Sequence, residues 1–146
     1  MTGSGKAKDR KDAHLALAAA PLAQSQQSAG FERVRLAHCA LPEANLQDID
    51  ITATCLGHAV AAPLFIGSMT GGTTHANSIN AALAEVAQQT GIGLAVGSQR
   101  ASLESGQSQA QLRKLAPSVP LIGNIGGVQL AAGNGVDLAQ RAVADI

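Results

Sequence analysis

The chain has 146 residues, with ten basic and ten acidic side chains and a formal net charge of zero. This balance provides no overall field that would attract nucleic acid, and two phenylalanines without tryptophan or tyrosine provide no platform for stacking bases. No apolar run approaches the ~18 residues that suggest a membrane span. We therefore expect neither a nucleic-acid partner nor a membrane partner.

The first predicted element is a short helix. Residues 1–8 are rich in glycine, serine and lysine and are expected to be disordered, whereas residues 9–20 are good helix formers that end before Pro21. The run RKDAH at residues 10–14 puts an arginine and a histidine on one helix face, with a lysine adjacent. Three nitrogenous groups in this arrangement fit a diphosphate, although a solvated helix start has the same composition.

A secretory leader is the competing interpretation of this start, since basic residues precede an alanine-rich stretch. Asp9 and Asp12 interrupt the basic region, however, and the apolar stretch is short. Cys39 and Cys55 are too few for a zinc site or a disulfide framework. These observations favour a cytoplasmic protein with buried free thiols.

The next elements precede the main repeat of the sequence. Alternation of apolar and charged residues predicts a short strand at 31–36, and residues 49–54 and 57–61 are expected to pair as an antiparallel hairpin. The repeat starts at residue 63. We therefore divide the chain into an amino-terminal extension, 1–62, and the main fold, 63–146.

Three apolar runs each end in glycine followed by a polar residue. They are PLFIGS at 63–68, GLAVGS at 93–98 and VPLIGN at 119–124, and their final residues are 30 and 26 positions apart. This spacing is typical of a strand, a helix and a parallel strand, and continuous apolar runs suit strands buried on both faces. The polar residues would then lie at the carboxyl ends of the strands, where parallel α/β folds bind ligands.

Helices are predicted between and after these strands, at 75–90, at 107–116 and from about residue 135. Gly91 and Pro117 supply the stops of the first two. In the first helix Ile79, Leu83 and Val86 fall on one face, and in the second Leu112 and Leu115 are expected to face inward. In the third, the apolar residues keep helical spacing: Val136, Ala139 and Val143.

The predicted fold class is α/β. A closed (β/α)₈ TIM barrel needs roughly 250 residues, so this chain would hold only the first three βα units of such a barrel, as the front part of a longer protein. A small three-unit α/β domain is the alternative, and its sheet would leave two unpaired edges.

Each loop after a predicted strand carries candidate binding groups. Paired glycines and hydroxyls in SMTGGTT at 68–74 would bind a flat ring or a phosphate, or else form a tight turn with Thr74 as helix N-cap. Arg100 would face an anion or solvent, and Asn124 would bind a heterocycle edge or form a turn. We find no nucleophile paired with a base and no carboxylate pair at a strand end, so we assign no catalytic or metal-binding residue.

Four motifs in order carry a family resemblance: RKxxH at 10–14, MTGG at 69–72, GSQR at 97–100 and GNIG at 123–126. With them, the chain resembles the amino-terminal part of type 2 isopentenyl-diphosphate delta-isomerase, the flavin-dependent form. The resemblance implies a TIM barrel that binds FMN and Mg²⁺, with NADPH as reductant. It also implies a homo-oligomer that interconverts isopentenyl and dimethylallyl diphosphate.

The resemblance also implies roles for individual residues. The substrate-binding residues would be Arg10, Lys11, Ser98, Gln99 and Arg100. The FMN-binding residues would be Ser68, Met69, Thr70, Ser98 and Asn124. In the family, the Gln-Glu pair and the flavin-phosphate site lie beyond the stretch that this segment matches. The segment alone is therefore expected to be inactive. Two alternatives stay open: another FMN-dependent TIM-barrel enzyme, such as a hydroxy-acid oxidase, and a non-catalytic α/β domain.

Overall fold

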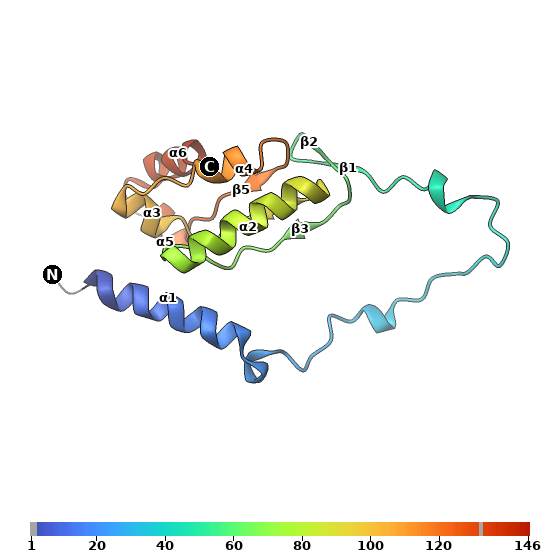
Figure 1. The fold of residues 1–146 in the computed structure, drawn as a ribbon, viewed down its shortest axis with the longest axis horizontal. Helices are drawn as coiled ribbons and strands as arrows, with labels where there is room; N and C mark the ends of the chain where they lie inside the picture. Colours follow the sequence, from blue (N-terminus) through green and yellow to red (C-terminus); the bar gives the residue numbers. More distant parts are fainter. Residues whose placement is uncertain (1–2, 132) are drawn as a thin grey trace.

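The computed structural model describes residues 3–131 and 133–146. It consists of an α/β unit, a separate amino-terminal helix beside it, and a long irregular segment that loops from one to the other (Figure 1). Within the described residues, no helix combines the length and the apolar character that crossing a membrane requires.

A three-stranded parallel sheet forms the centre of the α/β unit. Its strands are β3 (Phe65–Ile66), β4 (Gly93–Ala95) and β5 (Leu121–Ile122), in the order β3-β4-β5. Leu94 lies opposite Ile66 on one side and Leu121 on the other. The predicted parallel pairing of the three apolar runs is therefore confirmed, although each strand is shorter than its run.

Helix α2 (Thr74–Thr90) connects β3 to β4, as predicted. Thr73 has an extended backbone, and its hydroxyl accepts a hydrogen bond of 3.1 Å from the amide of Ala76. Thr73 is therefore the N-cap, and the assignment of Thr74 was wrong by one residue. Gly91 ends the helix with a left-handed φ of 69°, as expected for a glycine at this position.

The buried face of α2 differs from the prediction. Val86 is 45% exposed, and Ile79 and Leu83 are only partly buried. The buried positions are instead Ala76, Asn80, Ala84 and Ala87. Small side chains on this face let the helix lie close to the sheet. The partly buried Leu83 packs against the core beside them, as its predicted face implies, whereas Val86 lies outside.

Four short helices follow β4 and β5. They are α3 (Arg100–Ser105) and α4 (Gln111–Leu115) before β5, then α5 (Gly127–Leu130) and α6 (Gly135–Ala144). The prediction of one helix over 107–116 was wrong in its first half, and it missed α3 and α5. The start of α6 was predicted correctly.

The core lies between α2, α4 and the sheet. Leu94 and Val96 from β4 and its end pack with Leu112 of α4 and with Val119, which precedes β5. In α6 the buried side chain is Ala142. Val136 and Val143 are each 76% exposed, so their helical spacing does not mark the buried face of this helix. The reason is that α6 packs against α3 and α5.

Helix α1 (Gly3–Ala19) begins earlier than predicted, since residues 3–8 are helical rather than disordered. Residues 1–2 of that predicted disordered stretch lie outside the described residues.

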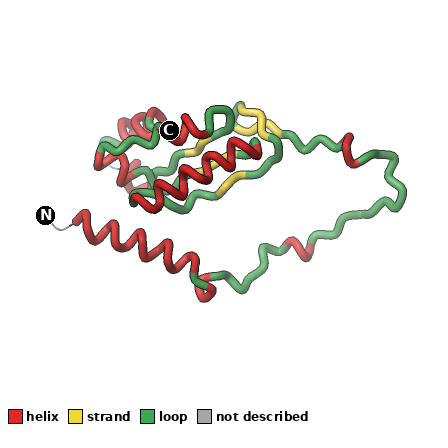
Figure 2. The backbone as a smooth tube through the Cα atoms, in the orientation of Figure 1, coloured by secondary structure: helices red, strands yellow, loops and turns green. Residues whose placement is uncertain are grey.

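After α1 the chain runs irregularly, with three single 3₁₀ turns, as Figure 2 shows. One turn is Phe31–Arg33, so the predicted strand at 31–36 was wrong. Cys39 in this segment is exposed, which corrects the expected burial.

An antiparallel hairpin ends the irregular segment. It consists of β1 (Ala53–Cys55) and β2 (His58–Val60), and it confirms the predicted pairing over a shorter length. Just after β2, the Ala61 amide donates to the carbonyl of Gly91, at 2.8 Å. Because Gly91 precedes β4, the hairpin lies at the amino ends of the parallel strands.

Candidate functional site

Hydrogen bonds join the loops at the carboxyl ends of the strands. The Ser68 hydroxyl donates to the carbonyl of Val96 at 2.6 Å, and the Gly97 amide donates to the carbonyl of Thr70 at 2.9 Å. Because these bonds link the loop after β3 to the loop after β4, the polar residues of the two motifs lie side by side.

Gln99 joins the second loop to the third. Its backbone amide donates to the carbonyl of Asn124 at 2.9 Å. Its side chain is fully buried, and Nε2 donates to the carbonyl of Ala142 in α6 at 3.0 Å. The structure thus places the Gln99 side chain beneath the loops, whereas its neighbours in the motif lie nearer the surface.

The predicted ring-binding residues form an open edge above the strand ends. Met69 is 70% exposed, Ser68 and Asn124 are exposed, and Ser98 is partly exposed. Thr70 is nearly buried, at 9% exposure. An exposed thioether together with hydroxyls and an amide in the strand-end loops combines an apolar surface with polar groups that accept or donate. This chemistry suits a flat heterocycle.

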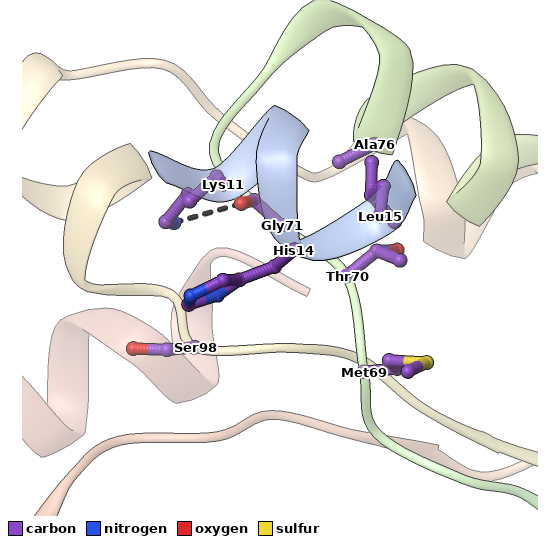
Figure 3. A pocket seen from close by; sticks show the side chains of 8 residues that line it. All are labelled: Lys11, His14, Leu15, Met69, Thr70, Gly71, Ala76 and Ser98. Atoms are coloured by element: carbon purple, nitrogen blue, oxygen red, sulfur yellow. Dashed lines mark hydrogen bonds between the residues drawn. The ribbon is translucent and has the colours of Figure 1, made fainter. Parts of the chain in front are cut away.

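Helix α1 approaches the same edge. The Lys11 ammonium donates to the carbonyl of Gly71, in the loop after β3, at 2.7 Å. A cavity of about 150 Å³ lies at this contact, between Lys11, His14 and Leu15 of the helix and the strand-end loops (Figure 3). This volume is well below that of sites for drug-sized ligands, so it can take a small group rather than a whole nucleotide.

The positive charges of the two predicted substrate motifs converge here. Partial burial lowers the pKa of Lys11, and the charges of Arg100 and Arg10 lower it further. Glu104 acts in the opposite direction, and it lies 3.9 Å from Arg100 across one helical turn. Three cations near one carboxylate are an arrangement that an anion would stabilise.

Gly72 allows Lys11 to reach its position. Its φ is +80°, a conformation that favours glycine, and a Cβ at this position would collide with the end of the Lys11 side chain. The paired glycines of the loop therefore have separate tasks: Gly71 offers its carbonyl, and Gly72 leaves the space.

Sequence reasoning missed two polar residues around the site. Glu104 pairs with Arg100, and Asn80 of α2 lies buried against Thr70 with two hydrogen bonds. A polar residue within the alanine-rich stretch of α2 was the available signal for Asn80, but its partner ten residues earlier is visible only in the fold. Among the residues that the structure describes, no three histidine, cysteine, aspartate or glutamate side chains gather in a way that could hold a metal ion.

Comparison with known proteins identifies the family. Residues 16–117 match the family described as FMN-dependent dehydrogenase. The chain belongs to this family. The matched residues include the loops after β3 and β4, which are two of the three loops that form the strand-end edge. The loop after β5 lies beyond the matched residues.

Curated relatives of this flavin family member share close to half of its residues. A protein from Xanthobacter autotrophicus is 47% identical over 97% of this chain and 42% of its own length. One from Pseudescherichia vulneris is 49% identical over 92% of this chain and 40% of its own, and one from Synechocystis is 48% identical over 80% and 34%. All three are named isopentenyl-diphosphate delta-isomerase. The chain spans about two fifths of the length of the first two relatives.

Proposed function

We propose that this chain supplies the substrate-binding and flavin-binding face of an isopentenyl-diphosphate delta-isomerase. The complete protein would interconvert isopentenyl and dimethylallyl diphosphate, using reduced FMN. The segment alone would be inactive. The support comes from relatives that bear this name at 46–49% identity over nine tenths or more of the chain.

The observation that carries the proposal is the hydrogen bond from Lys11 to Gly71. It brings the Arg10–Lys11 pair, 60 residues earlier in the chain, to the strand ends, next to Arg100. A diphosphate carries several negative charges, and guanidinium and ammonium groups are its preferred partners. We propose that Arg10, Lys11, Ser98, Gln99 and Arg100 form the diphosphate side. Gln99 would act indirectly. Its backbone amide holds the second loop to the third, and its buried side chain holds the loop to α6.

The residues at the strand ends fit a flavin ring. We propose that Ser68, Met69, Thr70, Ser98 and Asn124 contact FMN. Ser68, Met69 and Asn124 are exposed at the strand ends and Ser98 is partly exposed, whereas Thr70 is buried next to Met69. The ring would lie outside the small cavity, over the strand ends. When bound, reduced flavin supplies the proton donor and acceptor that this segment lacks. The chain's own residues would hold the diphosphate and exclude water from one side.

The fold proposal follows from the same family. We propose that β3, β4 and β5 with their helices are the first three βα units of a (β/α)₈ barrel, with residues 1–62 as an extension and 63–146 as barrel. Parallel order and strand-end loops on one edge support this. Mg²⁺, NADPH, a homo-oligomer and a cytoplasmic location complete the proposal, and we assign no residue of this segment to the metal.

The test is Arg10→Ala in the complete natural protein. Loss of one charge-assisted contact of about 1.5–3 kcal/mol should raise the KM for isopentenyl diphosphate roughly tenfold or more, with flavin content unchanged. Arg35→Ala is the matched control, since Arg35 is exposed in the irregular segment. An unchanged KM for Arg10→Ala would overturn the diphosphate assignment.

The family description, FMN-dependent dehydrogenase, is compatible with one rival function. This rival is a flavin-dependent oxidoreductase, such as one that oxidises a small hydroxy acid. Such an enzyme would use the same strand ends but would have no need for the cation pair of α1. Flavin reduction by a hydroxy acid, together with no turnover of isopentenyl diphosphate, would establish that rival.

A further inference from the structure

Asn80 and Thr70 form a reciprocal pair beneath the strand-end edge. The Thr70 hydroxyl is 2.6 Å from Asn80 Oδ1, and Asn80 Nδ2 is 3.2 Å from the Thr70 carbonyl. Asn80 is 4% exposed. The Thr70 carbonyl also accepts from the Gly97 amide, so this one residue joins α2 to both loops.

The direction of these hydrogen bonds follows from chemistry. A carbonyl oxygen can only accept, so the atom of Asn80 that faces the Thr70 carbonyl must be the NH₂ group. The amide oxygen then faces the Thr70 hydroxyl, and that hydroxyl must donate its hydrogen. The opposite amide orientation would set two acceptors against each other in a buried site, which costs about 1–3 kcal/mol.

A hydroxyl has a single hydrogen. Once Asn80 takes it, the Thr70 oxygen can only accept a hydrogen bond from a ligand. Ser68 is in the same state, because its hydroxyl donates to the carbonyl of Val96. Both hydroxyl oxygens beside Met69 can therefore only accept a further hydrogen bond, and Thr70 is one of the residues that line the cavity at the strand ends.

We propose that Asn80 is a positioning residue that fixes Thr70 as an acceptor, so that the site favours a ring edge that carries N–H groups. The inference rests on the proposed flavin site. A reduced flavin ring carries hydrogen on a ring nitrogen that is bare in the oxidised ring. A fixed acceptor at Thr70 therefore stabilises the reduced ring relative to the oxidised one.

The experiment uses the complete natural protein stripped of flavin. Dissociation constants are measured for oxidised FMN and, without oxygen and with dithionite as reductant, for reduced FMN. Asn80→Leu removes the amide and frees the Thr70 hydroxyl to turn and donate. We expect the preference for reduced over oxidised FMN to fall about threefold to tenfold, the effect of one hydrogen bond. A tenfold fall lowers the two-electron midpoint potential by about 30 mV.

Three further variants separate this effect from a general loss of structure. Thr70→Val removes the acceptor and should lower the preference, whereas Thr70→Ser keeps it and should not. Asn77→Leu is the matched control one turn earlier on α2, because the Asn77 side chain makes no hydrogen bond within residues 3–131 and 133–146. If Asn80→Leu does not fold, the comparison of Thr70→Val with Thr70→Ser decides.

The outcomes distinguish the two proposals. A parent protein that binds neither form of FMN overturns the proposed function. A parent that binds FMN, with variants that weaken both forms equally, leaves the function standing and overturns the role of Asn80. A selective loss of reduced FMN in Asn80→Leu and Thr70→Val, absent from both controls, supports it.

Discussion

Lys11 is the residue at which two distant parts of the chain meet. Partial burial and two neighbouring cations lower its pKa, so it loses its proton at a lower pH than an exposed lysine. Without bound ligand, the unfolded chain therefore keeps the Lys11 proton up to a higher pH than the folded chain does. Folding stability should therefore rise with pH through this interval, up to the ordinary lysine pKa.

Diphosphate binding should show the opposite pH dependence. In the proposed site, only the protonated form of Lys11 would attract the diphosphate, so the KM for substrate should rise as pH increases through the lowered pKa. Lys11→Arg stays charged throughout, and its KM should be flat in the same range. The measurement is a KM profile from neutral to alkaline pH for both proteins. Parallel profiles would show that Lys11 does not contact the anion.

Gly72 offers a test of the space that Lys11 occupies. Gly72→Ala should cost about 1–3 kcal/mol of stability, because its φ is left-handed, and it should also displace the Lys11 side chain. We expect a higher KM for substrate. Gly127→Ala is the control, since open space surrounds that glycine and its φ is not left-handed.

A double mutant isolates the steric part of this effect. If Gly72→Ala acts on the substrate through Lys11, it should raise KM no further in a Lys11→Ala background. Additive effects on KM would place the action of Gly72 elsewhere in the loop.

At the scale of the element, the loop after β3 is fixed where it joins the first turn of α2. Thr73 is 4% exposed and caps the helix through its hydroxyl. Thr73→Ala should lower the free energy of unfolding of the complete protein by about 1 kcal/mol, whereas Thr73→Ser should retain most of it. Thr74→Ala should change it by less than about 0.5 kcal/mol, because Thr74 is exposed. Chemical denaturation measures both.

Elements were predictable where the sequence signal is local. Three apolar runs ending in glycine indicated the strands, and Gly91 indicated the end of α2. The inward face of α2 was not predictable from hydropathy, because alanines and Asn80 occupy it while Val86 lies outside. The alternating run at 31–36 failed for a related reason: among the described residues it has no neighbouring strand to pair with, and it forms a turn instead.

The sequence was sufficient to predict which loops form the site. It was not sufficient to predict how α1 and the Gln99 side chain are placed around them. Residues after parallel strands must gather at one edge, so Ser68, Ser98 and Asn124 could be grouped from sequence. The placement of α1 depends on a contact over 60 residues, and no local rule supplies it. The orientation of Gln99 depends on α6, which packs beneath it.

At the scale of the whole molecule, much apolar surface is left uncovered. Five residues of the irregular segment are 80–98% exposed. They are Leu22, Phe31, Leu36, Leu41 and Leu46. Within the described residues, β3 and β5 each pair on one side only. Uncovered apolar surface and unpaired strand edges both promote self-association.

The 146-residue chain expressed alone should therefore self-associate. Sedimentation velocity over a range of concentrations should show species larger than a monomer, with a broad thermal transition. A monomer that unfolds in one sharp, cooperative step would contradict this expectation.

The path of the irregular segment has one further consequence. Helix α1 sits at the carboxyl ends of the strands, yet the chain re-enters the fold through a hairpin at their amino ends. The segment between them acts as a tether, and it sets the effective concentration of α1 over the strand ends, on the order of millimolar for a flexible link. A single proteolytic cut near residue 40 would turn that intramolecular encounter into a bimolecular one. The strand-end edge would remain whole, while α1 and its cations would dissociate from it.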